Sequence, residues 1–216
     1  MRAGDEIASY KLRRGRTGPT SIAAHARLWP VFGIDPPYIG LVRSHPLALE
    51  IGFGMGEATV AMAAAEPEVD LLAVEVHPAG IAALLRRLEE AALANVRVVD
   101  GDAVHVLEAL PEQCLSEVRL LFPDPWPKAR HAKRRLLRPS FAALLASRLE
   151  PSGFLHLATD SQAYADHATE VLTDWDLRVG PRPQRRPTTG YERRAVTAGR
   201  AVIDLIARPP RDRGQR

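Results

Sequence analysis

The most informative segment of the chain reads Leu47-Ala48-Leu49-Glu50-Ile51-Gly52-Phe53-Gly54-Met55-Gly56. It begins with a short apolar run, typical of a buried strand, and it ends in three closely spaced glycines. Glycines at such a point allow a sharp turn and a close approach between the backbone and a ligand. A helical pattern follows at residues 57–65 and is stopped by Pro67. The segment therefore predicts a strand, a ligand-binding turn and a helix.

The alternation of strand and helix continues along the rest of the chain. We predict strands at 47–51, 71–76, 96–99, 118–122, 153–158, 177–179 and 201–206. We predict helices at 57–65, 78–94, 103–110, 139–149 and 162–172. This pattern favours an α/β fold with a mostly parallel, seven-stranded sheet and helices on both faces. The last two strands have no predicted helix between them, which indicates a C-terminal antiparallel hairpin at one edge.

The length and composition of the chain bound its organisation. With 216 residues it favours one domain, and its first 44 residues are rich in Gly, Pro and Arg and poorly periodic. We expect a basic arm at 1–44, a folded domain at 45–208 and a disordered tail at 209–216. No apolar run approaches the ~20 residues of a membrane span, and no signal peptide is present, so we expect a cytoplasmic protein without membrane contact.

The charges are unevenly distributed along the chain. Its 29 Lys and Arg residues against 26 Asp and Glu give a formal net charge of only +3. Basic residues nevertheless gather in three stretches, at 11–27, 128–138 and 178–200, whereas residues 50–124 are acidic or balanced. This arrangement favours a polyanion bound around a neutral or cationic site, with solvated surface loops as the alternative interpretation.

The spacing of the glycines separates two classes of cofactor. A dinucleotide fingerprint, G-x-G-x-x-G, would need glycine at position 57, where the chain has Glu57. The E-x-G-x-G-x-G pattern that is present is associated with S-adenosylmethionine. Glu75 ends the second predicted strand, where a carboxylate can accept hydrogen bonds from two ribose hydroxyls. Asp102 follows the third strand and suits the adenine edge, although capping of the next helix is the alternative.

The densest motif follows the fourth predicted strand and reads Phe122-Pro123-Asp124-Pro125-Trp126-Pro127-Lys128-Ala129-Arg130-His131-Ala132-Lys133-Arg134-Arg135. Prolines on both sides hold Asp124 in an extended turn, which fixes its carboxylate beside the cofactor. Trp126 can either stack on a base or pack in the core, and the basic run can follow phosphates.

These motifs together resemble those of the tRNA (guanine(46)-N7)-methyltransferase family, whose members are Rossmann-like class I S-adenosylmethionine-dependent enzymes. The resemblance covers nearly the whole chain and adds four segments to those above: Val74-Glu75-Val76-His77, Gly101-Asp102-Ala103, Ala158-Thr159-Asp160 and Arg186-Pro187-Thr188-Thr189-Gly190-Tyr191-Glu192. The chain departs from the family at Gly190, where lysine is usual, at Ala195, where glycine is usual, and at Arg200, where histidine is usual.

The resemblance implies a role for each motif. We expect the cofactor to be bound by Glu50, Gly52, Gly54, Gly56, Glu75, Asp102 and Asp124, with Asp124 also the catalytic residue. We expect the target nucleotide to be held by Lys128, Asp160, Thr189, Tyr191 and Glu192. We expect RNA contacts from Arg130, His131, Lys133, Arg134 and Arg135.

The implied reaction transfers a methyl group from S-adenosylmethionine to N7 of guanine 46 in the variable loop of tRNA, leaving S-adenosylhomocysteine. Two alternatives stay open: a class I methyltransferase acting on another RNA or on a small molecule, and a non-catalytic RNA-binding module. The histidines lack partners at metal-ligand spacing, so we expect no metal ion. We expect the protein to be a monomer or a homodimer.

Overall fold

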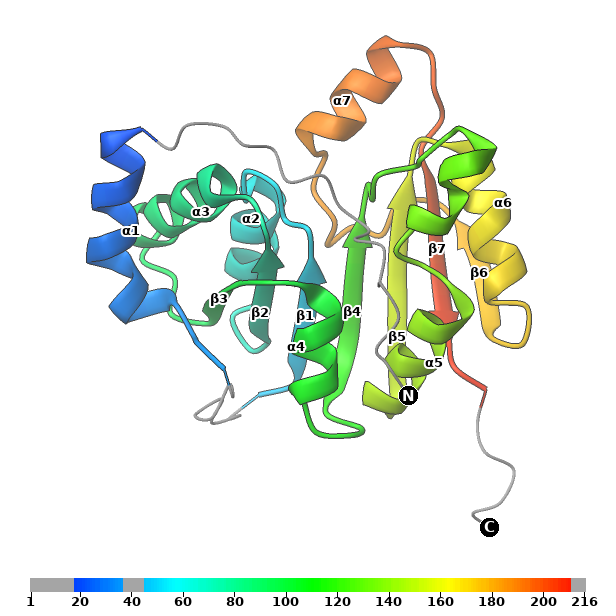
Figure 1. Ribbon diagram of the computed structural model, residues 1–216, viewed down its shortest axis with the longest axis horizontal. Helices are drawn as coiled ribbons and strands as arrows, with labels where there is room; N and C mark the ends of the chain where they lie inside the picture. The colour runs from blue at the N-terminus through cyan, green and yellow to red at the C-terminus, as the bar shows by residue number, and fades with distance from the viewer. Residues whose placement is uncertain (1–17, 37–44, 211–216) are drawn as a thin grey trace.

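The computed structural model describes residues 18–36 and 45–210, which form a seven-stranded sheet covered by helices (Figure 1). The strands are β1 (Leu47–Ile51), β2 (Asp70–Glu75), β3 (Val96–Asp100), β4 (Leu115–Leu121), β5 (Leu149–Thr159), β6 (Asp176–Gly180) and β7 (Ile203–Arg208). Their order across the sheet is β3-β2-β1-β4-β5-β7-β6. The first five strands pair in parallel, whereas β7 pairs antiparallel with both β5 and β6. The predicted sheet is thus confirmed.

Helices cover both faces of the sheet, as predicted. They are α1 (Pro19–Phe32), α2 (Glu57–Ala65), α3 (Pro78–Glu90), α4 (Ala103–Ala109), α5 (Pro139–Arg148), α6 (Gln162–Val171), α7 (Gly190–Thr197) and the 3-10 helix η1 (Ala129–Arg134). One buried apolar cluster joins α1, α2 and α3 to the sheet, and a second joins α4, α5 and α6 to the opposite face. Figure 1 shows α7 standing apart from both layers, above the carboxyl ends of β4 and β5.

The strand order places a crevice at the centre of the sheet. From β1 the chain crosses to β2 on one side, whereas from β4 it crosses to β5 on the other. The neighbouring strands β1 and β4 therefore form a topological switch point, where connecting loops diverge beyond the carboxyl ends of the strands. Ligands of open α/β sheets bind at this point, so the fold itself directs attention to the loops after Ile51 and Leu121.

One prediction about the C-terminal strands was wrong. The sequence pattern predicted no helix between the last two strands, but α7 lies between β6 and β7. The antiparallel pairing is present all the same, with Val179 opposite Leu205 and Arg178 opposite Ile206. The predicted antiparallel pair at the edge of the sheet is therefore confirmed, and the connection between its two strands carries α7.

The N-terminal 44 residues contain a helix that the sequence pattern did not predict. Ala24, Leu28 and Phe32 of α1 recur every four residues and are buried, and α1 packs against α3. The remaining parts of the predicted arm, 1–17 and 37–44, and residues 211–216 of the predicted tail lie outside the described residues. Among the helices that the structure describes, none is long and apolar enough to cross a membrane.

Candidate active site

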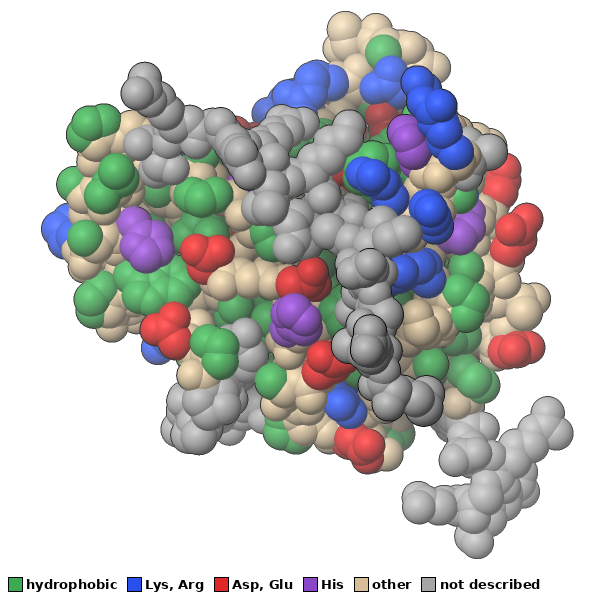
Figure 2. Space-filling view, in the orientation of Figure 1, with side chains coloured by type: hydrophobic (Ala, Val, Ile, Leu, Met, Phe, Trp, Pro, Cys, Tyr) green, Lys and Arg blue, Asp and Glu red, His purple; other side chains and the backbone are tan. Residues whose placement is uncertain are grey.

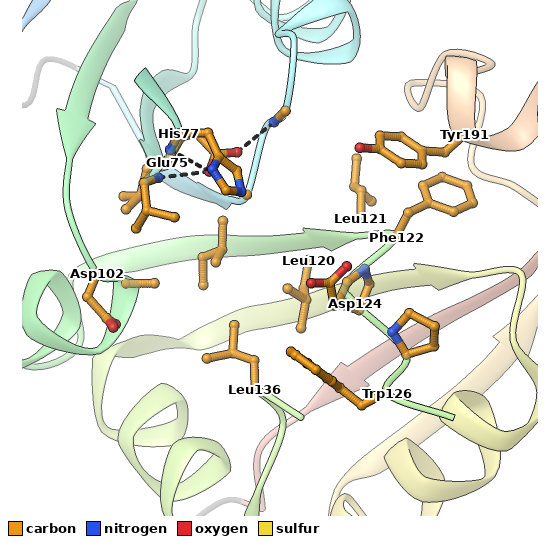
Figure 3. A pocket seen from close by; sticks show the side chains of 18 of the residues that line it. Glu75, His77, Asp102, Leu120, Leu121, Phe122, Asp124, Trp126, Leu136 and Tyr191 are labelled. Atoms are coloured by element: carbon orange, nitrogen blue, oxygen red, sulfur yellow. Dashed lines mark hydrogen bonds between the residues drawn. The ribbon is translucent and has the colours of Figure 1, made fainter. Parts of the chain in front are cut away.

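A cavity of about 380 Å³ lies beyond the carboxyl ends of β1, β2 and β4 (Figure 3). Its lining includes Gly52 and Gly54 of the turn after β1, the end of β2, the start of α4 and the whole turn from Phe122 to Pro127. Gly56, also predicted to bind the cofactor, is not among the described residues that line it. Three carboxylates line it, those of Glu75, Asp102 and Asp124. The cavity thus brings together residues that are far apart in sequence but were predicted to share one site.

The glycine turn adopts a backbone that other residues rarely take. Gly52, Gly54 and Gly56 have φ angles of 74°, 60° and 77°, in the left-handed region that glycine enters without steric cost. The turn is fastened to β2, because the Gly54 N–H donates to Glu75 Oε2 at 2.9 Å. Glu75 Oε1 accepts from the Val76 and His77 N–H groups at 2.8 and 3.2 Å. Glu75 therefore shapes the turn as well as lining the cavity.

Gly80 is in close contact with the glycine turn, and the sequence analysis did not identify it. It lies in the first turn of α3, and a Cβ atom added there would be only 2.2 Å from the Gly54 carbonyl oxygen. Only glycine lets α3 approach the glycine turn this closely. The sequence contained a signal, since a lone glycine inside a helical pattern often marks a close packing contact.

Asp102 has two functions in the structure. It is the N-cap of α4, where its Oδ1 accepts a hydrogen bond from the Val104 N–H at 2.8 Å. The alternative interpretation of Asp102 as a helix cap is therefore correct. Asp102 also lines the cavity, so the capping hydrogen bond fixes the Asp102 carboxylate at the edge of the cavity.

Glu50 lies beneath the cavity and is not among its lining residues. It lies on β1, is 2% exposed, and its Oε2 atom lacks a hydrogen-bond partner among the described residues. Arg119, opposite it on β4, is the nearest balancing charge. Burial raises the pKa of Glu50 to about 7, and Arg119 opposes the rise. Glu50 therefore takes up a proton near neutral pH.

This pKa predicts a pH-dependent stability. The folded chain binds the Glu50 proton more tightly than the unfolded chain, whose carboxyl has a pKa near 4.5. The contribution of Glu50 to the free energy of unfolding is therefore fully present below pH 4.5 and is lost as the pH rises through about 7. Glu50→Gln should gain stability relative to the unsubstituted protein as the pH rises from 5 to 8, measured by urea denaturation at each pH. A stability difference that is independent of pH would contradict this assignment.

The turn after β4 is held in a strained conformation. Phe122 and Trp126 have φ angles of 54° and 42°, which are uncommon for residues other than glycine. The Phe122 N–H donates to the Ala158 carbonyl at 2.7 Å, which fixes the start of the turn to β5. Asp124 at its centre is exposed, lines the cavity and has no hydrogen-bond donor among the described residues. Strain of this kind is typical of functional sites, and the strained turn places Asp124 in the lining of the cavity.

Trp126 packs rather than offering a free stacking surface. It is 5% exposed, and the Arg134 guanidinium lies over its ring at 5.0 Å. His131 approaches the same ring edge-on, with 5.7 Å between ring centroids. Of the two interpretations of Trp126, core packing is the one that the structure supports.

The predicted RNA-binding residues, on η1 and at its C-cap Arg135, divide into two groups. Arg134 and Arg135 are half-buried, and Arg135 donates from Nε to the Pro125 carbonyl at 3.2 Å. With His131, they brace the turn that carries Asp124. Arg130 and Lys133 are exposed.

Figure 2 shows Lys and Arg side chains gathered on the upper right of this face, around α7 and the neighbouring loop, with acidic side chains below them.

The predicted nucleotide-binding residues are not all brought to the cavity. Among the described α7 side chains, Tyr191 lines the cavity (Figure 3). Its ring lies nearly parallel to that of Phe122, with 6.0 Å between the ring centroids. Asp160, at the end of β5, is paired with Arg200 at 2.9 Å. Lys128 caps η1 and is exposed. None of Lys128, Asp160, Thr189 or Glu192 is among the described residues that line the cavity.

Comparison with known proteins identifies the family. A family model described as "Putative methyltransferase" matches residues 44–205. The tRNA (guanine-N(7)-)-methyltransferase of Nitrosospira multiformis is 46% identical over 217 residues, covering 94% of each chain. That of Methylococcus capsulatus is 45% identical over 216 residues and also covers 94% of each chain.

The fold agrees with this relationship. The crystal structure of the 16S rRNA methyltransferase KamB superposes with a TM-score of 0.60 at 15% identity, covering 82% of this chain and 95% of that one. At this identity the likeness concerns the fold alone, which is that of class I methyltransferases. Together with the relatives above and the cavity at the switch point, it shows that the chain belongs to the tRNA (guanine-N(7)-)-methyltransferase family.

Proposed function

We propose that this protein transfers a methyl group from S-adenosylmethionine to N7 of guanine 46 in the variable loop of tRNA. The proposal rests on the position of the Asp124 carboxylate at a cavity built on a glycine turn. This carboxylate is exposed and has no hydrogen-bond donor among the described residues. The family relationship supports both the reaction and the tRNA substrate. A substrate of this kind also supports a cytoplasmic location.

The residues of the cavity fit S-adenosylmethionine. The left-handed glycine turn leaves no side chain between the backbone and a ligand, and the cavity volume is in the range of small-molecule sites. Glu75 and Asp102 offer acceptors for ribose hydroxyls and for the adenine edge. When bound, the cofactor supplies a methyl group on a sulfonium centre. The Asp124 carboxylate, which lines the cavity, suits its positive charge.

The reaction needs orientation more than proton transfer. Guanine N7 carries a lone pair and no proton, so no general base is required, and holding N7 in line with the methyl group supplies most of the rate. Positive charge passes to the purine as the methyl group moves. The Asp124 carboxylate beside the ring stabilises this charge, and it can also accept hydrogen bonds from guanine N1–H or the exocyclic amine.

Tyr191 is proposed to stack on the target base once the Arg194 guanidinium, which lies 4.6 Å from the centre of its ring, moves aside. It is 54% exposed at the mouth of the cavity, and a Cβ added to Gly54 would lie 3.7 Å from its ring. An aromatic face attracts a base that is becoming cationic. The Asp160 carboxylate would also contact the target base once its ion pair with Arg200 opens. Lys128 would contact a neighbouring phosphate.

The exposed cations of η1 are proposed to contact tRNA phosphates. Arg130→Ala/Lys133→Ala should weaken tRNA binding and reduce the slope of log K against log[salt] by about 1 for each lost phosphate contact. Filter binding at several salt concentrations measures both quantities.

The matched control for this double variant is Arg86→Ala/Arg97→Ala, which removes the same charge from α3 and β3. It should leave the salt slope unchanged. Equal slopes for the two double variants would show that η1 does not contact the RNA.

The proposed function is tested by incubating the protein with labelled S-adenosylmethionine and unmodified bulk tRNA. The labelled nucleoside released by digestion should be 7-methylguanosine. Label in a different nucleoside would favour a class I methyltransferase with another target. Tight tRNA binding with neither label transfer nor cofactor binding would favour the non-catalytic RNA-binding module.

A further inference from the structure

Arg186 joins three parts of the site through one buried guanidinium group. Its side chain is fully buried, and it donates to both oxygens of Asp204 on β7, from Nε and from Nη2, each at 2.8 Å. The remaining nitrogen, Nη1, donates to Glu192 Oε2 on α7 at 2.6 Å. The guanidinium carbon also lies 5.6 Å from the centre of the Phe122 ring, at the start of the turn that carries Asp124.

The sheet side of this contact is held by further buried interactions. Asp204 is 3% exposed and also meets His156 Nε2 of β5 at 2.8 Å. Burial acts to raise the pKa of Asp204, but hydrogen bonds from His156 and Arg186 outweigh it and hold that pKa below the usual value. The preceding residue, Arg185, pairs with Glu117 of β4. The segment before α7 is therefore fixed to three neighbouring strands.

The α7 side of the contact does not face the cavity. Thr189 is the N-cap of α7, and its Oγ1 accepts from the Glu192 N–H at 3.0 Å. The Glu192 side chain is 12% exposed and lies between Arg186 and Arg182. Both residues thus build and attach the helix. Tyr191, between them in sequence, is the α7 residue that lines the cavity.

We propose that Arg186 is a positioning residue, which holds α7 over the cavity through Glu192 and thereby places Tyr191 against Phe122. On this account Glu192 acts through Arg186 and does not bind the target guanine. The inference rests on the proposed function for its substrate, but the position of α7 can be measured without substrate.

Lysine cannot replace Arg186 in this arrangement. A planar guanidinium contacts Asp204 with two nitrogens while a third reaches Glu192, whereas an ammonium group is a single point charge. Removing the charge altogether would take from Asp204 and Glu192 the guanidinium that each contacts most closely, which risks a general loss of stability. Arg186→Lys keeps the charge and is therefore the informative variant.

The first test measures Arg186→Lys at saturating tRNA and cofactor. We expect the single-turnover rate of methyl transfer to fall at least tenfold, while the Kd for S-adenosylmethionine and the KM for tRNA stay within about twofold. The melting temperature should be close to that of the unsubstituted protein, which separates positioning from a purely structural role. A rate within twofold of normal would overturn the proposal.

The second test asks whether Glu192 touches the guanine. Inosine lacks the exocyclic amine, so a direct ligand of that amine would discriminate between guanosine and inosine at the target position. We expect Glu192→Gln to lower both rates and to leave their ratio unchanged within about twofold. The double variant Arg186→Lys/Glu192→Gln should be no slower than the slower single variant. A changed ratio, or effects of the two substitutions that multiply, would contradict a shared role.

A third measurement is independent of activity. Arg186→Lys should speed amide hydrogen exchange in α7 at least tenfold and leave exchange in α6 unchanged. Unchanged exchange in α7 would overturn the positioning role even if the protein methylated a different substrate. If exchange in α7 rises but the unsubstituted protein does not methylate tRNA, the proposed function fails and the anchoring of α7 stands.

Discussion

Asp124→Asn should lower the rate of methyl transfer by at least about 100-fold, in line with the loss of one preorganised electrostatic contact at a reaction centre. The carboxylate lies at the centre of a strained turn and is exposed to the cavity without a hydrogen-bond donor among the described residues. Asparagine keeps the shape but removes the charge that stabilises the methylated purine. The Kd for S-adenosylmethionine should change much less, because Glu75, Asp102 and the glycine turn remain.

The rate of a single turnover and cofactor binding by calorimetry check the two halves of this prediction. Asp166→Asn, the same chemical change on an exposed position of α6, is the matched control and should behave normally. Near-normal turnover by Asp124→Asn would remove Asp124 from the mechanism. A parallel loss of rate and cofactor affinity would assign it to cofactor binding alone.

Gly80→Ala should weaken S-adenosylmethionine binding by about 10- to 100-fold, because overpacking at a close contact costs roughly 1–3 kcal/mol. The added methyl group would be 2.2 Å from the Gly54 carbonyl oxygen and 3.6 Å from Glu75 Cγ. The helix or the glycine turn must therefore shift, and the turn contributes directly to the cavity. Titration calorimetry with the cofactor measures the effect.

Gly180→Ala provides the control for this substitution. Gly180 ends β6, and an added Cβ there would meet no atom within 4 Å. This variant should bind the cofactor normally. If Gly80→Ala also bound it normally, the contact between α3 and the glycine turn would not be important for the site.

The sequence predicted the parallel part of the fold well, because each of those strands carries its own local signal. Residues 47–51 and 71–76 are short runs that are apolar except for one glutamate each, and β1 and β2 cover nearly the same residues. The helix at 57–65 was predicted with its observed bounds. The cavity-lining carboxylates were also predictable, since Glu75, Asp102 and Asp124 each follow an apolar strand and therefore lie at one edge of the sheet.

The two unpredicted helices lack a comparable signal. α1 contains Pro30, and a proline inside a helical segment argues against a helix. α7 has a single buried residue, Ala195, so it shows little apolar periodicity. Its start was nevertheless encoded, because Thr189 followed by Glu192 has the spacing of a capping box. The resemblance to substrate-binding motifs led to a different interpretation of the same residues.

Long-range contacts were beyond prediction from the sequence. The pairing of Arg186 with Asp204 and the approach of Gly80 to Gly54 depend on how separate elements pack. No local pattern encodes them. The same limit applies to Glu50, whose place under the cavity follows from the direction of one side chain in β1.

The most direct test of the central claim is methyl transfer to a tRNA transcript that carries 7-deazaguanosine at position 46. This base lacks N7 and keeps every other group of guanine. The account predicts that the ordinary transcript gains one methyl group per molecule. A control transcript with 7-deazaguanosine in place of a different guanosine should also gain one. The transcript with 7-deazaguanosine at position 46 should gain none. Methylation of the transcript substituted at position 46 would contradict it.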